Sequence, residues 1–365
     1  MLKSIRDKIK FYVNPEWRIS DVDHTFFLYP FWGISISKDR IFNLKLFKKF
    51  NFKERPYEIV NDIRKCHFVL APYRYAFLKK KPSLFNKYLK KARKFNKPLL
   101  LDDTGDIAHH IKEKDVYVLR IGGYRHDKKN NEIYFPPFAD DLLEEYYNGE
   151  LQIRNKKFIA TVGFSGWSLI SKWQFIKFFI KEIPTRLLAI YNDNYITNSK
   201  GVFWRIKANK ILEKSDIIRT NFIKRKSYSA HTATAEKKME ILRKEFVENL
   251  INSDYALCVR GDANSATRFY EALSLGRIPV ILDTNWIFPF EEAIDYGKFS
   301  LIVNFRDLNN LDKIINNFHR NISNDDFIKM QKLARLAFVD YFRLDSLINL
   351  LVTKLWNIRN EIKGV

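Results

Sequence analysis

Short apolar runs alternate with helical segments along most of this chain, and this alternation limits the fold more than any other feature. In the first half the strand-like runs are TFFLYP (25–30), HFVLAPY (67–73), PLLLDD (98–103) and VYVLRIGG (116–123). In the second half they are FIATVGF (158–164), RLLAIYND (186–193), YALCV (255–259), IPVILD (278–283) and KFSLIVNF (298–305). Helical segments between such runs predict βαβ units and parallel sheets. The chain is therefore expected to be an α/β protein.

Two domains are expected. The 365 residues exceed what one compact core usually holds. The chain turns irregular near residues 130–155 before a new strand-like run begins, so we expect one α/β domain over 1–154 and another over 155–342. The tail 343–365 is expected to pack back on the N-terminal domain. Helices are predicted over 308–319, 325–340 and 344–363.

Cysteine content and hydropathy favour a cytoplasmic protein. Cys66 and Cys258 both lie in apolar runs, which argues against a disulfide framework. No apolar run approaches the ~18 residues of a membrane-spanning helix, and the first ten residues lack the apolar region of a signal peptide. The chain is therefore expected in the cytoplasm.

Positive charge is concentrated near the N-terminus. The net charge is +22, and residues 1–100 hold 24 basic and 8 acidic side chains. Two basic segments with apolar residues at helical spacing, 1–12 and 81–98, predict helices that lie on an anionic bilayer. The alternative is that each is an ordinary surface helix docked on the core. A basic surface also attracts phosphorylated substrates or nucleic acid.

The stretch RGDANSATRFYEALSLGRIPVILD, residues 260–283, carries the strongest functional signal. A strand is predicted just before it, so the polar loop RGDANSA lies at the carboxyl end of a strand, where ligands bind in open α/β sheets. TRFYEALSL predicts a helix that ends at Gly276, with Asn264 or Ser265 as its N-cap. The unpaired N–H groups at the start of such a helix suit a phosphate.

Two side chains of this helix favour an anionic ligand. Arg268 falls in the first turn, where the helix dipole disfavours a cation unless an anion compensates. Glu271 follows at i+3, and its carboxylate is able to accept hydrogen bonds from sugar hydroxyls. The alternative is a plain surface ion pair between these two residues.

The same stretch resembles the exostosin-type glycosyltransferases of family GT47. The resemblance rests on RGD, then S, R and EAL at matching spacing, then G.IPVI and PF. The matching residues are Arg260, Gly261, Asp262, Ser265, Arg268, Glu271, Ala272, Gly276, Ile278, Pro279, Val280, Pro289 and Phe290. Weaker likeness extends to Asp103, Gly105, Asp106, Arg120 and the segment Pro137 to Asp141. One departure is Arg277, where the family often has a small residue.

The resemblance implies a GT-B fold, in which two Rossmann-like domains face a central cleft and the C-terminal domain holds a nucleotide-sugar. It implies that Arg260 and Arg268 serve the donor site, with Arg268 on the diphosphate, and that Glu271 contacts the ribose. Gly261 and Ser265 would shape the phosphate loop. It also implies inverting transfer with no cofactor and no essential metal.

The basic run 219–231 offers further cations for the diphosphate, namely Arg219, Lys224 and Arg225. Solvated loop charge is the alternative for all three.

Inverting transfer needs a group that takes the proton of the acceptor hydroxyl. We expect this base in the turn that holds Asp103 and Asp106, with His24 as the second candidate. Asp102, His109 and His110 lie near that turn, and a structural role of its aspartates in turns or caps is the alternative. The pair Asp21 and Asp23 forms a D-x-D that could hold a metal, a pattern that is common by chance.

The sequence thus predicts an inverting glycosyltransferase that moves a sugar, from a UDP-sugar for preference, to an oligosaccharide or lipid-linked saccharide of a surface polysaccharide or glycolipid. Its basic N-terminal domain is expected at the inner face of an anionic membrane. The alternatives are a GDP-sugar enzyme of fucosyltransferase type and a basic nucleic-acid-binding protein, although we recognise no nucleic-acid-binding module and expect no such partner. A nucleotide-dependent oxidoreductase is disfavoured, because the G-x-G-x-x-G fingerprint and the P-loop are absent.

Overall fold

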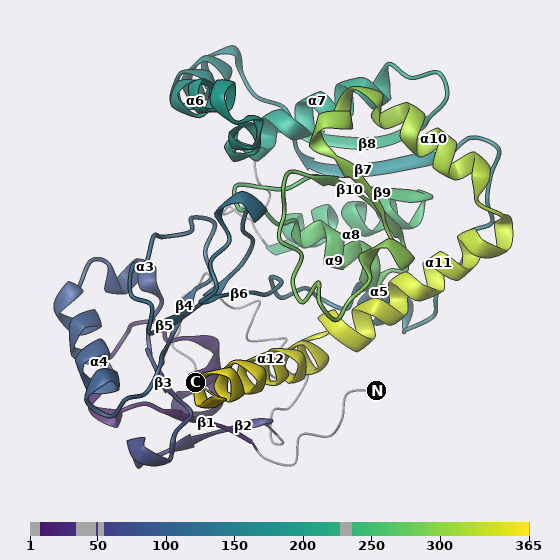
Figure 1. Cartoon of the computed structure of the whole chain (residues 1–365). Coiled ribbons are helices and arrows are strands. Elements are labelled where there is room, and N and C mark those ends of the chain that lie inside the picture. Colours follow the sequence, from purple (N-terminus) through teal and green to yellow (C-terminus); the bar gives the residue numbers. More distant parts are fainter. Residues whose placement is uncertain (1–7, 34–48, 50–54, 227–235, 365) are drawn as a thin grey trace. The chain divides into compact units, whose positions relative to one another are not determined.

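The computed structural model describes residues 8–33, 49, 55–226 and 236–364 of the chain. These residues form two compact units (Figure 1). Unit 1 contains the described residues up to Ile121, the segment Lys128–Phe138 and the chain from Tyr341 onwards. Unit 2 contains Gly122–Asp127 and Ala139–Asp340.

Unit 1 is built on a parallel sheet, as the alternation of apolar runs predicted. Its strand order is β2-β1-β3-β4-β5-β6, and every pairing is parallel. The strands are β1 (Ile9–Tyr12), β2 (Tyr57–Val60), β3 (Phe68–Leu70), β4 (Leu99–Asp103), β5 (Val116–Arg120) and β6 (Glu132–Tyr134). The helices are α1 (Tyr29–Trp32), α3 (Tyr75–Leu78), α4 (Pro82–Lys94) and α12 (Leu344–Gly364).

Two predictions for the N-terminal region are wrong. Residues 9–12, expected in a helix, form β1 between β2 and β3, because pairing with two strands overrides the local helical spacing. Residues 1–7 lie outside the described part. The run 25–30, expected as a strand, forms a 3-10 turn over Phe26–Leu28 and then α1. Its aromatic side chains pack in a buried cluster, in which the Phe27 ring lies 4.9 Å from Phe11.

Helix α4 forms where a basic helix was predicted, but its apolar face is not available to a bilayer. Its apolar side chains Phe85, Tyr88, Leu89 and Ala92 are buried in unit 1, so the alternative of a docked surface helix is confirmed. The lysines Lys87 and Lys90 remain exposed on the opposite side.

Unit 2 contains a second parallel sheet with helices on both faces. Its strand order is β11-β10-β9-β7-β8. The strands are β7 (Thr161–Trp167), β8 (Arg219–Arg225), β9 (Tyr255–Cys258), β10 (Ile278–Asp283) and β11 (Leu301–Asn304). The helices are α5 (Leu142–Tyr147), α6 (Lys172–Tyr191), α7 (Gly201–Glu213), α8 (Glu236–Ile251), α9 (Thr267–Ser274), α10 (Leu311–Asn321) and α11 (Asn324–Ala337). Helices α7 and α10 cover one face, and α8 and α9 lie on the other (Figure 1).

Two elements of unit 2 differ from the prediction. The run 186–193, expected as a strand, continues α6 past Pro184 to Tyr191. Leu187 and Tyr191 keep the helical spacing of the preceding apolar residues, and the place beside β7 is taken by β8 instead. Strand β8 lies in the basic run 219–231, for which the sequence predicted no strand.

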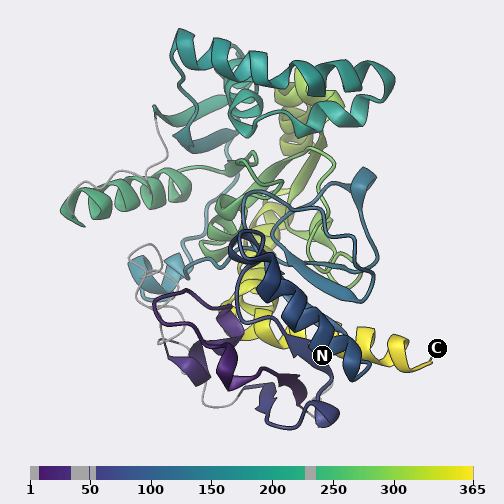
Figure 2. The ribbon, with the colours of Figure 1, turned by 90° about the vertical axis from the view of Figure 1, so that its left-hand side faces the viewer.

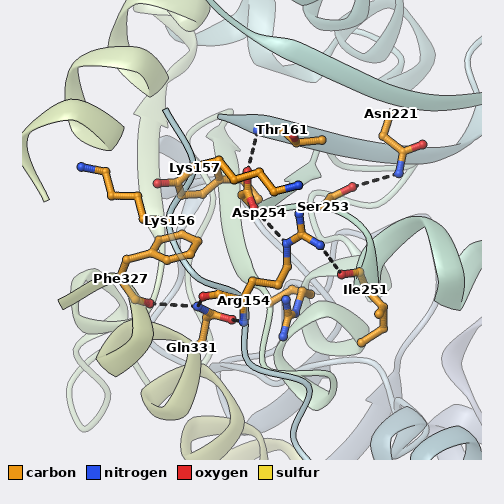
Figure 3. Close-up of polar contacts among 12 residues, drawn as sticks. Arg154, Lys156, Lys157, Thr161, Asn221, Ile251, Ser253, Asp254, Phe327 and Gln331 are labelled. Atoms are coloured by element: carbon orange, nitrogen blue, oxygen red, sulfur yellow. Dashed lines mark hydrogen bonds and ion pairs between the residues drawn. The ribbon is translucent and has the colours of Figure 1, made fainter. Parts of the chain in front are cut away.

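A polar cluster at the amino ends of β7 and β9 ties the segment before residue 157 to unit 2 (Figure 3). The guanidinium of Arg154 pairs with Asp254 at 2.9 Å, and the other oxygen of that carboxylate accepts the Thr161 N–H at 2.8 Å. The amide of Gln331 on α11 donates to the Arg154 carbonyl and accepts from its N–H, at 2.8 and 2.9 Å. Residues 139–154 belong to unit 2, whereas the predicted boundary at 154 assigned them to the first domain.

The C-terminal helix α12 lies in unit 1, where it contacts β1. Its Trp356 ring lies 4.9 Å from the ring of His67.

Candidate functional site

The sequence correctly predicted the succession of β9, a polar loop and α9. The residue that caps the start of α9 differs from the prediction. The N-cap is Ala266, which provides no side-chain hydrogen bond. Neither expected cap, Asn264 or Ser265, has that role. The Asn264 side chain instead donates to the Thr284 carbonyl at 3.1 Å and to the Gly123 carbonyl at 3.0 Å. The Ala266 cap therefore offers no side-chain acceptor, and the Phe269 N–H donates to the Ala266 carbonyl at 2.9 Å.

The loop itself is closed by backbone contacts. The Gly261 N–H donates to the Ser265 carbonyl at 3.3 Å, so a backbone hydrogen bond joins the two residues that were expected to shape a phosphate loop. Gly201, the first residue of α7, packs against the carbonyls of Arg260 and Gly261 so closely that a Cβ there would overlap them. This loop is consequently held between α7 and α9.

Arg260 supports this loop from within. Its guanidinium is buried and donates to the carbonyls of Thr197 and Ser199, and to the Asp262 carbonyl at 3.1 Å. Burial lowers the pKa of this guanidinium from its usual range. The side chain that was expected among the donor-binding groups therefore acts on the backbone of the loop.

Arg268 lies in the first turn of α9, as predicted. Its guanidinium donates to the Ser165 carbonyl near the carboxyl end of β7 and lies 4.5 Å from the centre of the Phe164 ring. Gly166 passes so close to this guanidinium that a Cβ would overlap it. Arg268 is thus fixed at the carboxyl edge of the sheet.

Glu271 is buried and forms an ion pair with a residue that the sequence did not single out. Arg243 on α8 donates to the Glu271 carboxylate at 2.6 Å and to Asp140 at 3.2 Å. Burial raises the pKa of Asp140 to about 6, despite the opposing charge of Arg243. Arg243 and Asp140 come from segments distant in sequence from Glu271, and no local pattern pointed to them.

The three basic residues expected from the run 219–231 all lie on β8, with Arg219 at its start and Lys224 and Arg225 at its end. Arg219 begins the strand and pairs in register with Thr161, the first residue of β7, so it lies at the amino edge of the sheet, away from the loop after β9. Lys224 lies near the carboxyl end and forms an ion pair with Glu213 at 2.6 Å. Arg225 ends the strand and pairs with Glu245 at 3.1 Å, so Lys224 and Arg225 both lie at the edge where the loop is.

In unit 1, Asp103 lies at the carboxyl end of β4 in a buried polar network. Its carboxylate accepts hydrogen bonds from the Nδ1 of His109 at 2.7 Å and from the His109 N–H at 2.9 Å. Arg120, its register partner on β5, also pairs with it and donates to the His109 carbonyl at 2.6 Å. Burial raises the pKa of the Asp103 carboxyl, while the hydrogen bonds from His109 and the charge of Arg120 oppose that shift.

This network favours His109 over the residues expected as the base. The Nδ1–H donated to Asp103 leaves Nε2 as the ring nitrogen that can take a proton. Asp106 is exposed on the turn that follows. His24 is buried, and its Nδ1 and Nε2 lie 3.2 and 2.8 Å from the carbonyls of Thr25 and Gly33. Burial lowers the pKa of His24, which fits a structural role.

Among the described residues, no group of three or more His, Cys, Asp or Glu side chains is arranged to hold a metal ion. Asp21 of the D-x-D pair has a left-handed backbone with φ of 58°, as in a turn.

A model of a known domain family matches part of unit 2. Residues 193–318, which include β8, β9, α9 and β10, match the model of the exostosin GT47 domain. This segment is an exostosin-like domain. It covers the loop after β9, Arg268 and Glu271, so the resemblance seen in the sequence is confirmed there.

The chain is also similar to individual proteins over short segments. The chain is 40% identical over 65 residues to the exostosin-1 homolog of Caenorhabditis elegans, which covers 18% of this chain and 17% of that protein. It is 25% identical over 118 residues to a probable glycosyltransferase of Arabidopsis thaliana, At5g03795, which covers 31% of this chain and 22% of the relative. The chain therefore spans about a sixth to a fifth of the length of these relatives.

Solved structures similar to this chain include a glycosyltransferase from Rickettsia africae, with a TM-score of 0.36 and 11% identity over 89% of this chain and 80% of that chain. Another is a mutant of S. aureus TarM in complex with fondaparinux, alpha-GlcNAc-glycerol and UDP. It has a TM-score of 0.37 and 10% identity over 80% of this chain and 55% of that chain.

Proposed function

We propose that this chain is an inverting glycosyltransferase that takes a nucleotide-diphosphate sugar, a UDP-sugar for preference, and transfers its sugar to a saccharide acceptor. The observation that carries the proposal is the start of α9 in the exostosin-like domain. There an N-terminus without a side-chain cap follows the carboxyl end of β9, with Arg268 fixed in its first turn. The positive end of the helix dipole and a cation at this place suit a diphosphate.

We propose the following roles around the diphosphate from where each side chain lies. Arg268 contacts the phosphates, and Lys224 at the carboxyl end of β8 supplies a second cation. Arg260 and Gly201 hold the loop in shape, and Gly261 and Ser265 close it. Glu271, oriented by Arg243, accepts hydrogen bonds from the ribose. Because the helix start and two cations neutralise the diphosphate, we propose that no metal is required.

We further propose that His109 is the base. Its Nε2 takes the proton of the acceptor hydroxyl as that oxygen attacks the anomeric carbon, and the nucleotide diphosphate leaves with the bonding electrons. Asp103 holds the imidazole in the required tautomer and stabilises the imidazolium that forms. Arg120 in turn fixes Asp103 and the His109 backbone.

The acceptor is proposed to be an oligosaccharide or lipid-linked saccharide, and the exposed lysines of α4 give unit 1 a surface suited to its anionic part. The proposed place of action is the cytoplasmic face of a membrane. Among the described residues, no helix is both long and apolar enough to span a bilayer.

Calorimetric titration with UDP, GDP, CMP and an oligonucleotide tests the donor site. We expect one uridine or guanosine diphosphate to bind, and Arg268→Ala to weaken that binding by about 10- to 100-fold, since a charge-assisted hydrogen bond contributes about 1.5–3 kcal/mol. Arg320→Ala, at an exposed position of α10, is the matched control and should bind as the wild type does. Binding of the oligonucleotide alone would overturn the proposal in favour of a nucleic-acid-binding protein.

A further inference from the structure

Helix α6 exposes an apolar stripe along its whole length. Trp173, Ile176, Ile180, Ile183, Leu187 and Tyr191 follow one another at spacings of three or four residues, so they share one face. Trp173 is 82% exposed, Ile180 58%, Leu187 55% and Tyr191 91%. Isolated exposed apolar residues are ordinary, but a continuous row along the whole helix marks a contact surface.

The opposite side of α6 attaches the helix to unit 2. The Phe178 ring packs against Trp167 and Phe203, at 6.3 and 6.5 Å between ring centres. Glu182, the helix's one acidic residue, is buried on this side and accepts a hydrogen bond from the Lys200 N–H. Figures 1 and 2 both show α6 at the periphery of its unit, away from the sheet. The stripe therefore faces outward from a firmly attached helix.

Charge along the stripe has a single sign. Lys172, Lys177 and Lys181 are exposed and border the apolar face on both of its sides, while Glu182 points inward. Tryptophan and tyrosine stand at the two ends of the stripe, and these residue types favour the boundary between water and lipid. An apolar face bordered by lysines is typical of helices that lie in the plane of an anionic bilayer.

We propose that α6 is a membrane-docking helix, whose apolar stripe inserts shallowly into an anionic lipid surface while its lysines contact the headgroups. It supplies the apolar contact that α4 cannot, because the apolar face of α4 is buried. The proposal concerns a surface outside the site around α9 and does not depend on the proposed activity. A second copy of the chain is the competing occupant of the stripe.

Vesicle sedimentation with the full chain tests the proposal. We expect binding to phosphatidylcholine vesicles that contain about a third phosphatidylglycerol, and at least tenfold weaker binding to phosphatidylcholine alone. Ile180→Asp with Leu187→Asp should reduce the binding by tenfold or more. The matched control is Ile241→Asp with Leu336→Asp, at positions that are 60% and 52% exposed elsewhere on unit 2. This control should bind as the wild type does.

The lysines are tested in the same way. Lys172, Lys177 and Lys181 changed together to Gln should weaken binding to the anionic vesicles by about 10- to 100-fold. The same change at the exposed Lys313, Lys329 and Lys332 should have a much smaller effect. The proposal also predicts a blue shift of tryptophan fluorescence on vesicle binding that Trp173→Phe removes.

Three results would overturn the proposal. The first is no binding to anionic vesicles, and the second is equal binding by the wild type and the Ile180/Leu187 variant. The third is a dimer in sedimentation velocity that this variant abolishes without any loss of vesicle binding, because the stripe would then be an interface between two copies. Unchanged nucleotide affinity in every α6 variant would show that the α6 surface acts independently of the donor site.

Discussion

The Nδ1 of His109 lies 2.7 Å from the Oδ1 of Asp103, and the backbone N–H of His109 donates to the other oxygen of the same carboxylate. This double contact fixes both the position of the imidazole and the nitrogen that carries its proton. A buried carboxylate that orients a partly exposed histidine is the arrangement that a general base requires. Asp103 cannot be the base alone, because its carboxylate is buried. His109 needs Asp103, because without that hydrogen bond its imidazole would be free to rotate.

The first prediction concerns this pair. His109→Ala should lower kcat for sugar transfer by about 10²- to 10⁴-fold with little change in donor affinity, because the proton acceptor is lost. Asp103→Asn should also lower kcat, and it should change the pH profile, because the tautomer is no longer fixed. His110→Ala is the matched control, since the neighbouring His110 is exposed and lies beside Lys129. Equal effects of the two histidine changes would exclude His109 as the base.

The second prediction concerns Asp140. Its pKa is raised to about 6 in the folded state from 3.8, so the folded protein binds more protons than the unfolded chain between these values. The contribution of Asp140 to the free energy of unfolding is therefore fully present below pH 4 and is lost as the pH rises through 6. Relative to Asp140→Asn, the wild type should lose on the order of 2 kcal/mol over this range. Urea unfolding of both proteins from pH 4 to 7 measures the difference, and a difference independent of pH would contradict the raised pKa.

The third prediction concerns the ion pair in Figure 3. Arg154→Ala leaves the buried carboxylate of Asp254 without its cation and should reduce the free energy of unfolding by about 3–5 kcal/mol. Arg306→Ala is the comparison, because its ion pair with Asp193 is exposed, and it should leave the unfolding free energy unchanged within error. Denaturant unfolding distinguishes them, and equal losses would show that burial does not decide the cost.

The fourth prediction concerns the loop after β9. Gly201→Ala should weaken nucleotide binding and reduce stability by about 1–3 kcal/mol, because its Cβ would lie 2.6 Å from the Arg260 carbonyl oxygen and force the loop away from α7. Gly297→Ala is the control, since its Cβ would only meet the Asp295 side chain at 3.4 Å. Wild-type nucleotide affinity in Gly201→Ala would show that the loop does not hold the donor.

The fifth prediction concerns metal ions. Dialysis against EDTA should leave the rate of sugar transfer unchanged, because the start of α9 together with Arg268 and Lys224 is proposed to neutralise the diphosphate. A loss of activity that Mg²⁺ or Mn²⁺ restores would contradict this proposal.

Much of the candidate site could be predicted because its signals are local. The run 255–283 contains a strand, a polar loop, a helix and a second strand in succession, and the structure has all four. The placement of Arg268 in the first turn of α9 follows directly from counting along that helix. The partner of Glu271 could not be predicted in this way, because Arg243 reaches it from α8.

Two errors concern the secondary structure of short segments. Residues 9–12 have helical spacing but form β1, and 186–191 have a β-like composition but continue α6. At 9–12 the local preference is small compared with the free energy gained by pairing with two strands. At 186–191 the apolar residues continue the helical spacing of α6 and stay largely exposed, while β8 pairs with β7 in the place of the expected strand. The N-cap prediction also failed, since the Asn264 amide gains two carbonyl partners from other loops.

The sequence by itself determined the α/β class, the succession of elements around α9 and the exostosin-like character of that region, because each depends on residues close together in the chain. The tertiary structure alone decided which polar side chains are available for chemistry. In the folded protein Arg260 and His24 contact backbone carbonyls, and Asp103 accepts a hydrogen bond from His109. The apolar face of α4 is buried, whereas that of α6 is exposed. Those outcomes depend on which segments meet in space, and the spacing of residues along a chain does not contain that information.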